Sequence, residues 1–196
     1  MLRSLVGSEM CIRDSIDLVV GGRPTKTLIL ATKAPHCLND LLFRQRSGHL
    51  NIDIAGVMAN NDALEEISGF YGVPFWWQAI NSDADKDAFE KRVLEVVEAE
   101  QIELVVLARY MRILSPELCE PLAGRAINIH HSFLPGFKGA NPYRQAHARG
   151  VKLIGATAHF VTADLDEGPI IEQNVIRVDH ANTPQELMAI GEDCLL

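Results

Sequence analysis

The sequence predicts an α/β fold with a Rossmann-like, doubly wound and mostly parallel sheet. Short apolar and β-branched runs alternate along the chain with segments whose apolar residues recur at helical spacing, which is the order of βαβ units. Runs such as 27–32 are almost continuously apolar, as strands of a parallel sheet are when both faces are buried. The chain has 196 residues, 47% of them hydrophobic, which favours a single domain with a sizeable core.

The first half of the chain supplies three expected strands and three expected helices. Strands are expected at 27–32, 52–58 and 75–80, and helices at 36–46, 62–71 and 85–101. Asp62 is the expected N-cap of the second helix, with Glu65 at the capping-box position, and Gly72-Val73-Pro74 ends that helix. The third helix is the clearest amphipathic one, because its apolar face carries Phe89, Val93, Val96 and Val97.

The second half continues the alternation. Strands are expected at 104–108, 126–130, 153–161 and 170–178. A helix begins after Ser115 as N-cap with Pro116 at its first position, a second covers 142–149, and a third begins at Thr183 with a capping box. Ligands of doubly wound sheets bind beyond the carboxyl ends of the strands. The end of the 126–130 strand is therefore the first place to look for chemistry.

That strand end carries an amide and an imidazole. Ile127 and Ile129 alternate with Asn128 and His130, so the two polar side chains share a face, and Pro135-Gly136 breaks the chain soon afterwards. A carboxylate follows the next strand, in the acidic loop that holds Asp164, Asp166 and Glu167.

An amide, an imidazole and a carboxylate that converge suit attack on a carbonyl carbon. Asn128 and a protonated His130 would donate to the oxyanion. Asp166 would hold the imidazole charged and take a proton from the attacking group. Because no Ser or Cys sits in a nucleophile elbow, the attacker is expected to be water or a substrate amine.

Two motifs carry a family resemblance. Asn128-Ile-His130-x-Ser132-x-Leu134-Pro135 together with Asp166-x-Gly168-Pro169-Ile170-Ile171 resembles the formyltransferase family that uses 10-formyltetrahydrofolate, from about Thr27 to the end of the chain. The run 130–135 is most similar to the hydrolases of that family, which deformylate the folate. The resemblance implies the formyltransferase fold, the catalytic residues Asn128, His130 and Asp166, and the supporting residues His131, Ser132 and His159. Without it, His159 would be interpreted as a core histidine.

The resemblance also implies two folate-binding segments. The first follows the 104–108 strand and comprises Met111, Arg112, Ile113 and Leu114. The second follows the 153–161 strand and comprises Val161, Thr162, Asp164 and Leu165. Without the resemblance, the first segment is equally typical of a loop with an ordinary surface arginine.

The formyl acceptor separates the main functional alternatives. A glycinamide ribonucleotide formyltransferase needs a phosphate cradle, usually a Gly-rich turn before the first helix. The corresponding stretch 32–40 has no glycine, a proline at Pro35 and an aspartate at Asp40. Hydrolysis of 10-formyltetrahydrofolate to formate and tetrahydrofolate is therefore the favoured reaction. A non-catalytic folate-binding protein is the alternative from another class, although it would not need all three catalytic residues.

Composition excludes several other classes of function. The net charge of −8 argues against a nucleic-acid partner, and no apolar run approaches the ~20 residues of a membrane span. Four scattered cysteines without CxxC spacing predict reduced thiols in the cytoplasm. Adjacent histidines on a strand point to opposite faces, so His130 and His131 predict no metal site. No cofactor is expected, since the folate is the substrate, and a homo-oligomer is left open.

The two ends of the chain differ from the rest. Residues 4–15 resemble a translated sequencing adapter, and residues 194–196 resemble its opposite-strand version. We therefore expect 1–15 and 194–196 to be non-native, 16–26 to be a linker or the remnant of a lost N-terminal regulatory domain, and 27–193 to be a C-terminally truncated catalytic domain. A signal peptide is the alternative for the N-terminus, although Glu9, Arg13 and Asp14 interrupt its apolar core.

Overall fold

A computed structural model of the chain describes residues 22–136 and 142–193. The segments expected to be non-native, 1–15 and 194–196, lie outside the described residues, as does 16–21 of the expected linker. One sheet of seven strands organises the described part, in the order β3-β2-β1-β4-β5-β6-β7. The predicted α/β class with a mostly parallel, doubly wound sheet is confirmed.

Five strands form the parallel part of the sheet. They are β1 (Thr25–Ala31), β2 (Ile52–Ala59), β3 (Phe75–Trp77), β4 (Leu104–Ala108) and β5 (Ala126–His130). Their carboxyl ends meet at one edge, where doubly wound sheets bind ligands. Two further strands, β6 (Leu153–Phe160) and β7 (Ile170–Arg177), extend the sheet in antiparallel pairing. No helix separates them, so the acidic loop that holds Asp166 connects them directly.

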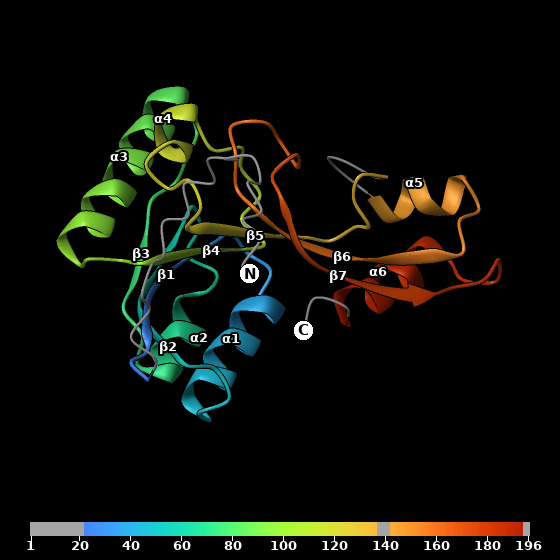
Figure 1. Cartoon of the computed structure of the whole chain (residues 1–196), viewed down its shortest axis with the longest axis horizontal. Helices are drawn as coiled ribbons and strands as arrows, with labels where there is room; N and C mark the ends of the chain where they lie inside the picture. The colour runs from blue at the N-terminus through green and yellow to red at the C-terminus, as the bar shows by residue number, and fades with distance from the viewer. Residues whose placement is uncertain (1–21, 137–141, 194–196) are drawn as a thin grey trace, which may run out of the picture.

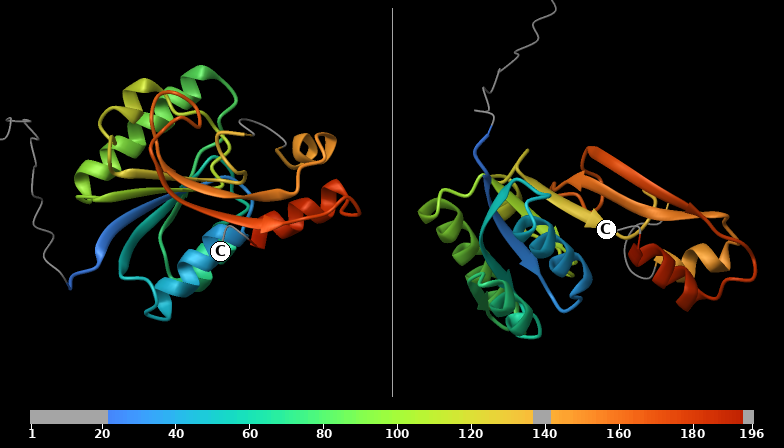
Figure 2. Two further views of the ribbon diagram at one scale, coloured as in Figure 1. Left: turned by 45° about the vertical axis from the view of Figure 1, so that its right-hand side comes forward. Right: turned by 90° about the horizontal axis from the view of Figure 1, so that it is seen from below.

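Helices cover both faces of the parallel part. In Figure 1, α3 (Asp83–Ala99) and α4 (Pro116–Cys119) lie above the sheet, and α1 (His36–Arg46) and α2 (Glu65–Tyr71) lie below it. Beyond the parallel part, α5 (Pro142–Ala148) and α6 (Pro184–Asp193) lie beside β6 and β7, as the right-hand view of Figure 2 shows.

The alternation of side chains along β1 divides the core into two layers. Leu28 and Leu30 pack with Phe89 and Val93 of α3, whereas Ile29 belongs to the cluster that contains Leu38 and Leu42 of α1. Successive residues of a strand face opposite sides of the sheet, which is why one apolar run can serve both layers. The buried layers fix the positions of the strand ends that carry the site.

Most predicted helix starts are correct, but those of α2 and α3 are not. Ser115 caps α4 through the backbone N–H of Leu118, and Thr183 and Glu186 form the predicted capping box of α6. Asp62, by contrast, does not cap α2, which begins only after Leu64 and has no side-chain cap. The side chain of Asn61 accepts from the N–H of Ala63 instead, and this local turn delays the helix.

The remaining differences concern element ends. Helix α3 begins at Asp83, two residues before the predicted start at 85. The reason is that Ser82 and Asp85 form a capping box there. The strand expected at 75–80 ends at Trp77, although Ile80 is still buried in the core. None of the described helices is long and apolar enough to cross a membrane.

Candidate active site

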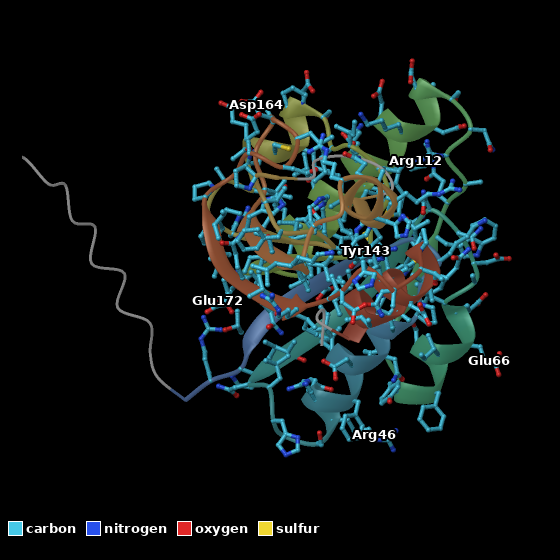
Figure 3. All side chains as sticks on the ribbon, turned by 90° about the vertical axis from the view of Figure 1, so that its right-hand side faces the viewer. Arg46, Glu66, Arg112, Tyr143, Asp164 and Glu172 are labelled. Carbon is cyan, nitrogen blue, oxygen red and sulfur yellow. The ribbon has the colours of Figure 1, made fainter. Side chains whose placement is uncertain are left out.

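A cavity of about 280 Å³ opens at the carboxyl ends of β4 and β5. Loop 109–115 after β4 forms one wall and loop 161–169 after β6 forms another. The lining includes Asn128, His130 and Asp166, the expected supporting residues His131 and His159, and every expected folate-binding residue: Met111, Arg112, Ile113, Leu114, Val161, Thr162, Asp164 and Leu165. Figure 3 labels Arg112 and Asp164, one from each wall.

His130 and Asp166 come from different elements and meet at the cavity. Nδ1 of His130 lies 3.5 Å from Oδ1 of Asp166, and both side chains are at least nine-tenths buried. The distance is longer than an ordinary hydrogen bond, as is common for catalytic pairs without a bound substrate. The carboxylate can therefore orient the ring and compensate a positive charge on it.

Loop 161–169 holds Asp166 by a backbone conformation that few residues adopt. Asp166 has φ 57°, in the left-handed region, where most residues are strained and Asp and Asn are tolerated best. Two residues later, Gly168 packs so tightly on the Phe160 carbonyl that a Cβ atom there would lie 1.7 Å from the oxygen. The turn and the close approach together bring the carboxylate back over the strand ends.

Asn128 is held by His159. The amide nitrogen of Asn128 lies 3.2 Å from Nε2 of His159, and Nδ1 of His159 lies 2.9 Å from the carbonyl oxygen of Phe160. A carbonyl can only accept, so Nδ1 carries the proton, and Nε2 of the neutral ring accepts from the Asn128 amide. This contact fixes which way the amide points.

His131 corrects one prediction from the sequence. Its ring lies 5.4 Å from that of His130, between centroids, and both rings line the cavity rather than opposite faces of the sheet. The reason is that β5 ends at His130, so the alternation of a strand no longer applies to the next residue. Burial, with the nearby charges of Arg109, His130 and His36, lowers the pKa of His131 from 6.5 to about 3.

The chain after His131 is tied to β6 and β7. The Thr157 hydroxyl donates to the carbonyl of Ser132 at 2.8 Å and accepts from the N–H of Leu134 at 3.1 Å. The side chain of Gln173 donates to the carbonyl of Leu134 at 2.9 Å. Ser132 is buried but does not line the cavity, so its contribution here is to hold the turn.

The first wall is anchored through its backbone and one arginine. The N–H of Met111 donates to the Thr32 hydroxyl at 3.1 Å, and Nη2 of Arg112 donates to the carbonyl of Ile80 at 2.9 Å. Met111 and Ile113 expose 56% and 57% of their surface, although both are large and apolar. Exposed apolar side chains on fixed loops suit the face of a flat ring system.

Arg109 was missed by sequence reasoning. It lines the cavity next to the catalytic candidates, directly after β4. A signal was available, because Arg109 follows one strand of the parallel pair and His130 ends the other.

Among the described residues, no group of three or more His, Cys, Asp or Glu side chains is arranged to hold a metal ion. Cys37 and Cys119 are buried and take part in no disulfide in this part of the chain.

A family model described as formyl transferase matches residues 25–193. A formyltetrahydrofolate deformylase of Corynebacterium sp. (strain P-1) is 52% identical over 172 residues, which is 88% of this chain and 60% of the relative. The Bacillus subtilis (strain 168) protein of the same name is 45% identical over 174 residues, covering 89% of this chain and 58% of the relative.

Solved structures of formyltetrahydrofolate deformylases and of glycinamide ribonucleotide transformylases are also similar to this chain. The crystal structure of formyltetrahydrofolate deformylase from Burkholderia mallei is 58% identical with a TM-score of 0.82, covering 88% of this chain and 61% of the other. Glycinamide ribonucleotide transformylase 1 from Symbiobacterium toebii is 31% identical with a TM-score of 0.79, covering 88% and 84%. The chain thus spans about 60% of the length of the curated relatives it matches.

Proposed function

The chain belongs to the formyl transferase family, and on that premise we propose that it hydrolyses 10-formyltetrahydrofolate to formate and tetrahydrofolate. The observation that carries the proposal is the meeting of Asn128, His130 and Asp166 at one cavity. The relatives named formyltetrahydrofolate deformylase support it, since they are 45–58% identical and the transformylase is 31% identical.

The reaction begins with attack of water on the formyl carbon. Asp166 takes a proton from the water, and its charge favours the protonated form of His130, 3.5 Å away. Nε2 of His130 and the amide N–H of Asn128 that does not face His159 donate to the formyl oxygen as it becomes an oxyanion. Collapse of the tetrahedral intermediate breaks the carbon–nitrogen bond, and N10 of the folate takes a proton.

The pteridine ring is expected to lie between the two loops. Loop 109–115 offers apolar side chains and anchored backbone, and loop 161–169 offers Val161, Thr162, Asp164 and Leu165. Such rings are held by apolar walls with a few polar groups that fix orientation. Asp164 is exposed and is labelled at the edge of the molecule in Figure 3, which supports a position at the mouth of the cavity rather than at the reacting carbon.

The segment between β1 and α1 favours water as the acceptor. Pro35 is the N-cap of α1 and makes no side-chain cap, Lys33 is exposed, and Thr32 is engaged by the N–H of Met111. A ribonucleotide phosphate needs several N–H donors at such a helix start. Formyl transfer to glycinamide ribonucleotide is the second candidate function, and the similarity to transformylase structures supports it.

The test is incubation with 10-formyltetrahydrofolate, with and without glycinamide ribonucleotide, while formate and tetrahydrofolate are followed. Formate release without the amine supports the hydrolase. Turnover only with the amine would replace it by the transferase. Binding of folate by a folded sample with no turnover in either arm would support a non-catalytic folate-binding protein.

The proposed reaction sets the other requirements of the protein. In the proposed reaction the folate is the substrate and Asp166 takes the proton of the attacking water, so neither a metal nor a nucleotide is required. Two buried thiols without a disulfide among the described residues support a reducing compartment, the cytoplasm. Assembly with further copies of the chain remains a prediction, to be measured by sedimentation.

A further inference from the structure

Arg109 is a charged residue of the cavity that has no role in the proposed reaction. Its backbone has φ 58°, in the left-handed region, one of three such non-glycine residues among those described. Strained residues that line a cavity are commonly functional, because the fold maintains the strain for a reason. The other strained residue that lines the cavity is Asp166.

The guanidinium of Arg109 has hydrogen-bond donors that the protein does not use. Nε and Nη1 are both buried, and neither has a hydrogen-bond partner within the described part of the chain. No ion pair among residues 22–136 and 142–193 includes Arg109. Buried donors without an acceptor are rare in native proteins, and a charged one is costly unless an anion meets it.

The position of Arg109 relates those donors to the reacting carbon. Leu107 of β4 is paired with Asn128 of β5, and Arg109 comes directly after the end of β4 whereas His130 ends β5, so both lie at the same edge of the sheet and line the cavity. Burial and, after it, the charge of Arg109 lower the pKa of the His131 ring to about 3, so that ring is neutral and the arginine supplies the positive charge. A cation therefore lines the same cavity as the oxyanion donors.

We propose that Arg109 binds the water-derived oxygen and the formate product, and so is a specificity-determining residue that favours water over an amine as the formyl acceptor. The inference rests on the proposed function. As water attacks, its oxygen bonds to the formyl carbon and one proton passes to Asp166. The carbon–nitrogen bond then breaks, and N10 keeps the electron pair and takes that proton from Asp166. The formic acid released loses the other proton of the original water to solvent.

Charge explains the selectivity. Attack by water adds a hydroxyl group, and loss of its proton from the formic acid product yields a carboxylate, which a guanidinium binds well. Attack by an amine builds positive charge on nitrogen and yields a neutral formamide, which the same guanidinium disfavours. One cation therefore both stabilises hydrolysis and opposes transfer.

The experiment compares Arg109→Gln and Arg109→Lys with the wild-type enzyme, and uses Arg92→Gln, exposed on α3, as the charge-matched control. For Arg109→Gln we expect kcat for hydrolysis to fall by about 10- to 100-fold, and inhibition by formate to weaken by at least ~10-fold. The KM for the folate should change by less than about twofold, because the pteridine is held elsewhere. The rate of formyl transfer to glycinamide ribonucleotide, relative to the rate of hydrolysis, should increase.

The kcat for hydrolysis and the inhibition by formate in Arg109→Lys should lie between those of the wild-type enzyme and Arg109→Gln. An ammonium keeps the charge but loses the planar fork of the guanidinium. If Arg109→Gln does not fold, this variant decides, and wild-type formate inhibition in it would overturn the inference. Unchanged hydrolysis and formate inhibition in Arg109→Gln would overturn it as well.

A binding measurement separates this inference from the proposed function. Line broadening of ¹³C-formate, with tetrahydrofolate present, needs no turnover. Wild-type enzyme that binds formate through Arg109 but never hydrolyses the folate would refute the proposed function and keep the anion site. Wild-type enzyme that hydrolyses the folate, with formate binding unaffected by Arg109→Gln, would refute only the inference.

Discussion

Asn128 and His159 lie directly opposite each other in the antiparallel pair of β5 and β6, with the amide nitrogen of Asn128 3.2 Å from Nε2 of His159. The pairing register, rather than the sequence near either residue, brings the two side chains together. Because Nε2 accepts one amide N–H, the other N–H is directed away from His159. His159 is thus a positioning residue for the amide that the proposed mechanism needs.

Replacing the acceptor should therefore impair catalysis without impairing folate binding. For His159→Phe we expect kcat to fall by roughly 10- to 100-fold, because an undirected Asn128 amide is a poorer oxyanion donor. His159→Gln retains a side-chain acceptor and should recover part of the loss. Steady-state kinetics would check both, and wild-type kcat in His159→Phe would contradict the positioning role.

Asp166→Asn and His130→Ala should each lower turnover by at least ~10²-fold while leaving tetrahydrofolate binding largely intact. The amide at position 166 neither takes the proton nor compensates a charged imidazole. Glu167→Gln is the matched control from the same loop and should stay within about twofold of the wild-type rate. Formate release and fluorescence titration with tetrahydrofolate measure the two properties, and wild-type rates in either variant would refute the assignment.

Thr157→Val should destabilise the turn that follows His130. The fully buried hydroxyl bonds the carbonyl of Ser132, the N–H of Leu134 and the side chain of Gln173, and valine removes all three bonds. We expect a loss of about 2–4 kcal/mol in unfolding free energy, from the loss of these buried hydrogen bonds. Thr27→Val, which removes one bond to the Thr25 carbonyl, should cost less. Urea denaturation of the two variants measures the difference. Equal losses of unfolding free energy would argue against a stabilising role for the hydrogen bonds of Thr157.

Gly168→Ala should disturb the loop that presents Asp166. The added methyl group would collide with the Phe160 carbonyl, and backbone atoms cannot move aside cheaply. We expect a loss of about 2 kcal/mol or more together with reduced kcat. The same change at Gly69, in α2 with open space around it, should instead stabilise by roughly 0.5–1 kcal/mol. Opposite shifts of the two urea midpoints are the expected result.

His131 makes stability depend on pH in the acid range. Its pKa is lowered from 6.5 to about 3, mainly by burial, so between these values the unfolded chain binds a proton that the folded chain does not. Stability therefore falls as the pH is lowered from about 6.5 towards 3, by at most about 1.4 kcal/mol per pH unit. His131→Asn should lose less stability than wild type between about pH 7 and about pH 5. Parallel pH curves for the two proteins would contradict this.

The helix boundaries show where local sequence suffices. Capping by Ser115 and by Thr183 was predictable, because an N-cap bond joins residues only three positions apart. The start of α2 was not, since Asn61 competes with Asp62 for the local backbone, and both offer the same chemistry. Local rules identify the element, and competing neighbours decide its first residue.

The sequence by itself determined the alternation of strands and helices and the shared face of Asn128 and His130. Both follow from the fixed periods of the strand and the helix, which need no partner. It also contained the paired motifs that resemble the formyl transferase family. Only the tertiary structure decided the rest: the register that sets His159 against Asn128, the turn that brings His131 into the cavity, and the unpaired buried donors of Arg109. These depend on packing between segments far apart in the chain, and no local pattern encodes that packing.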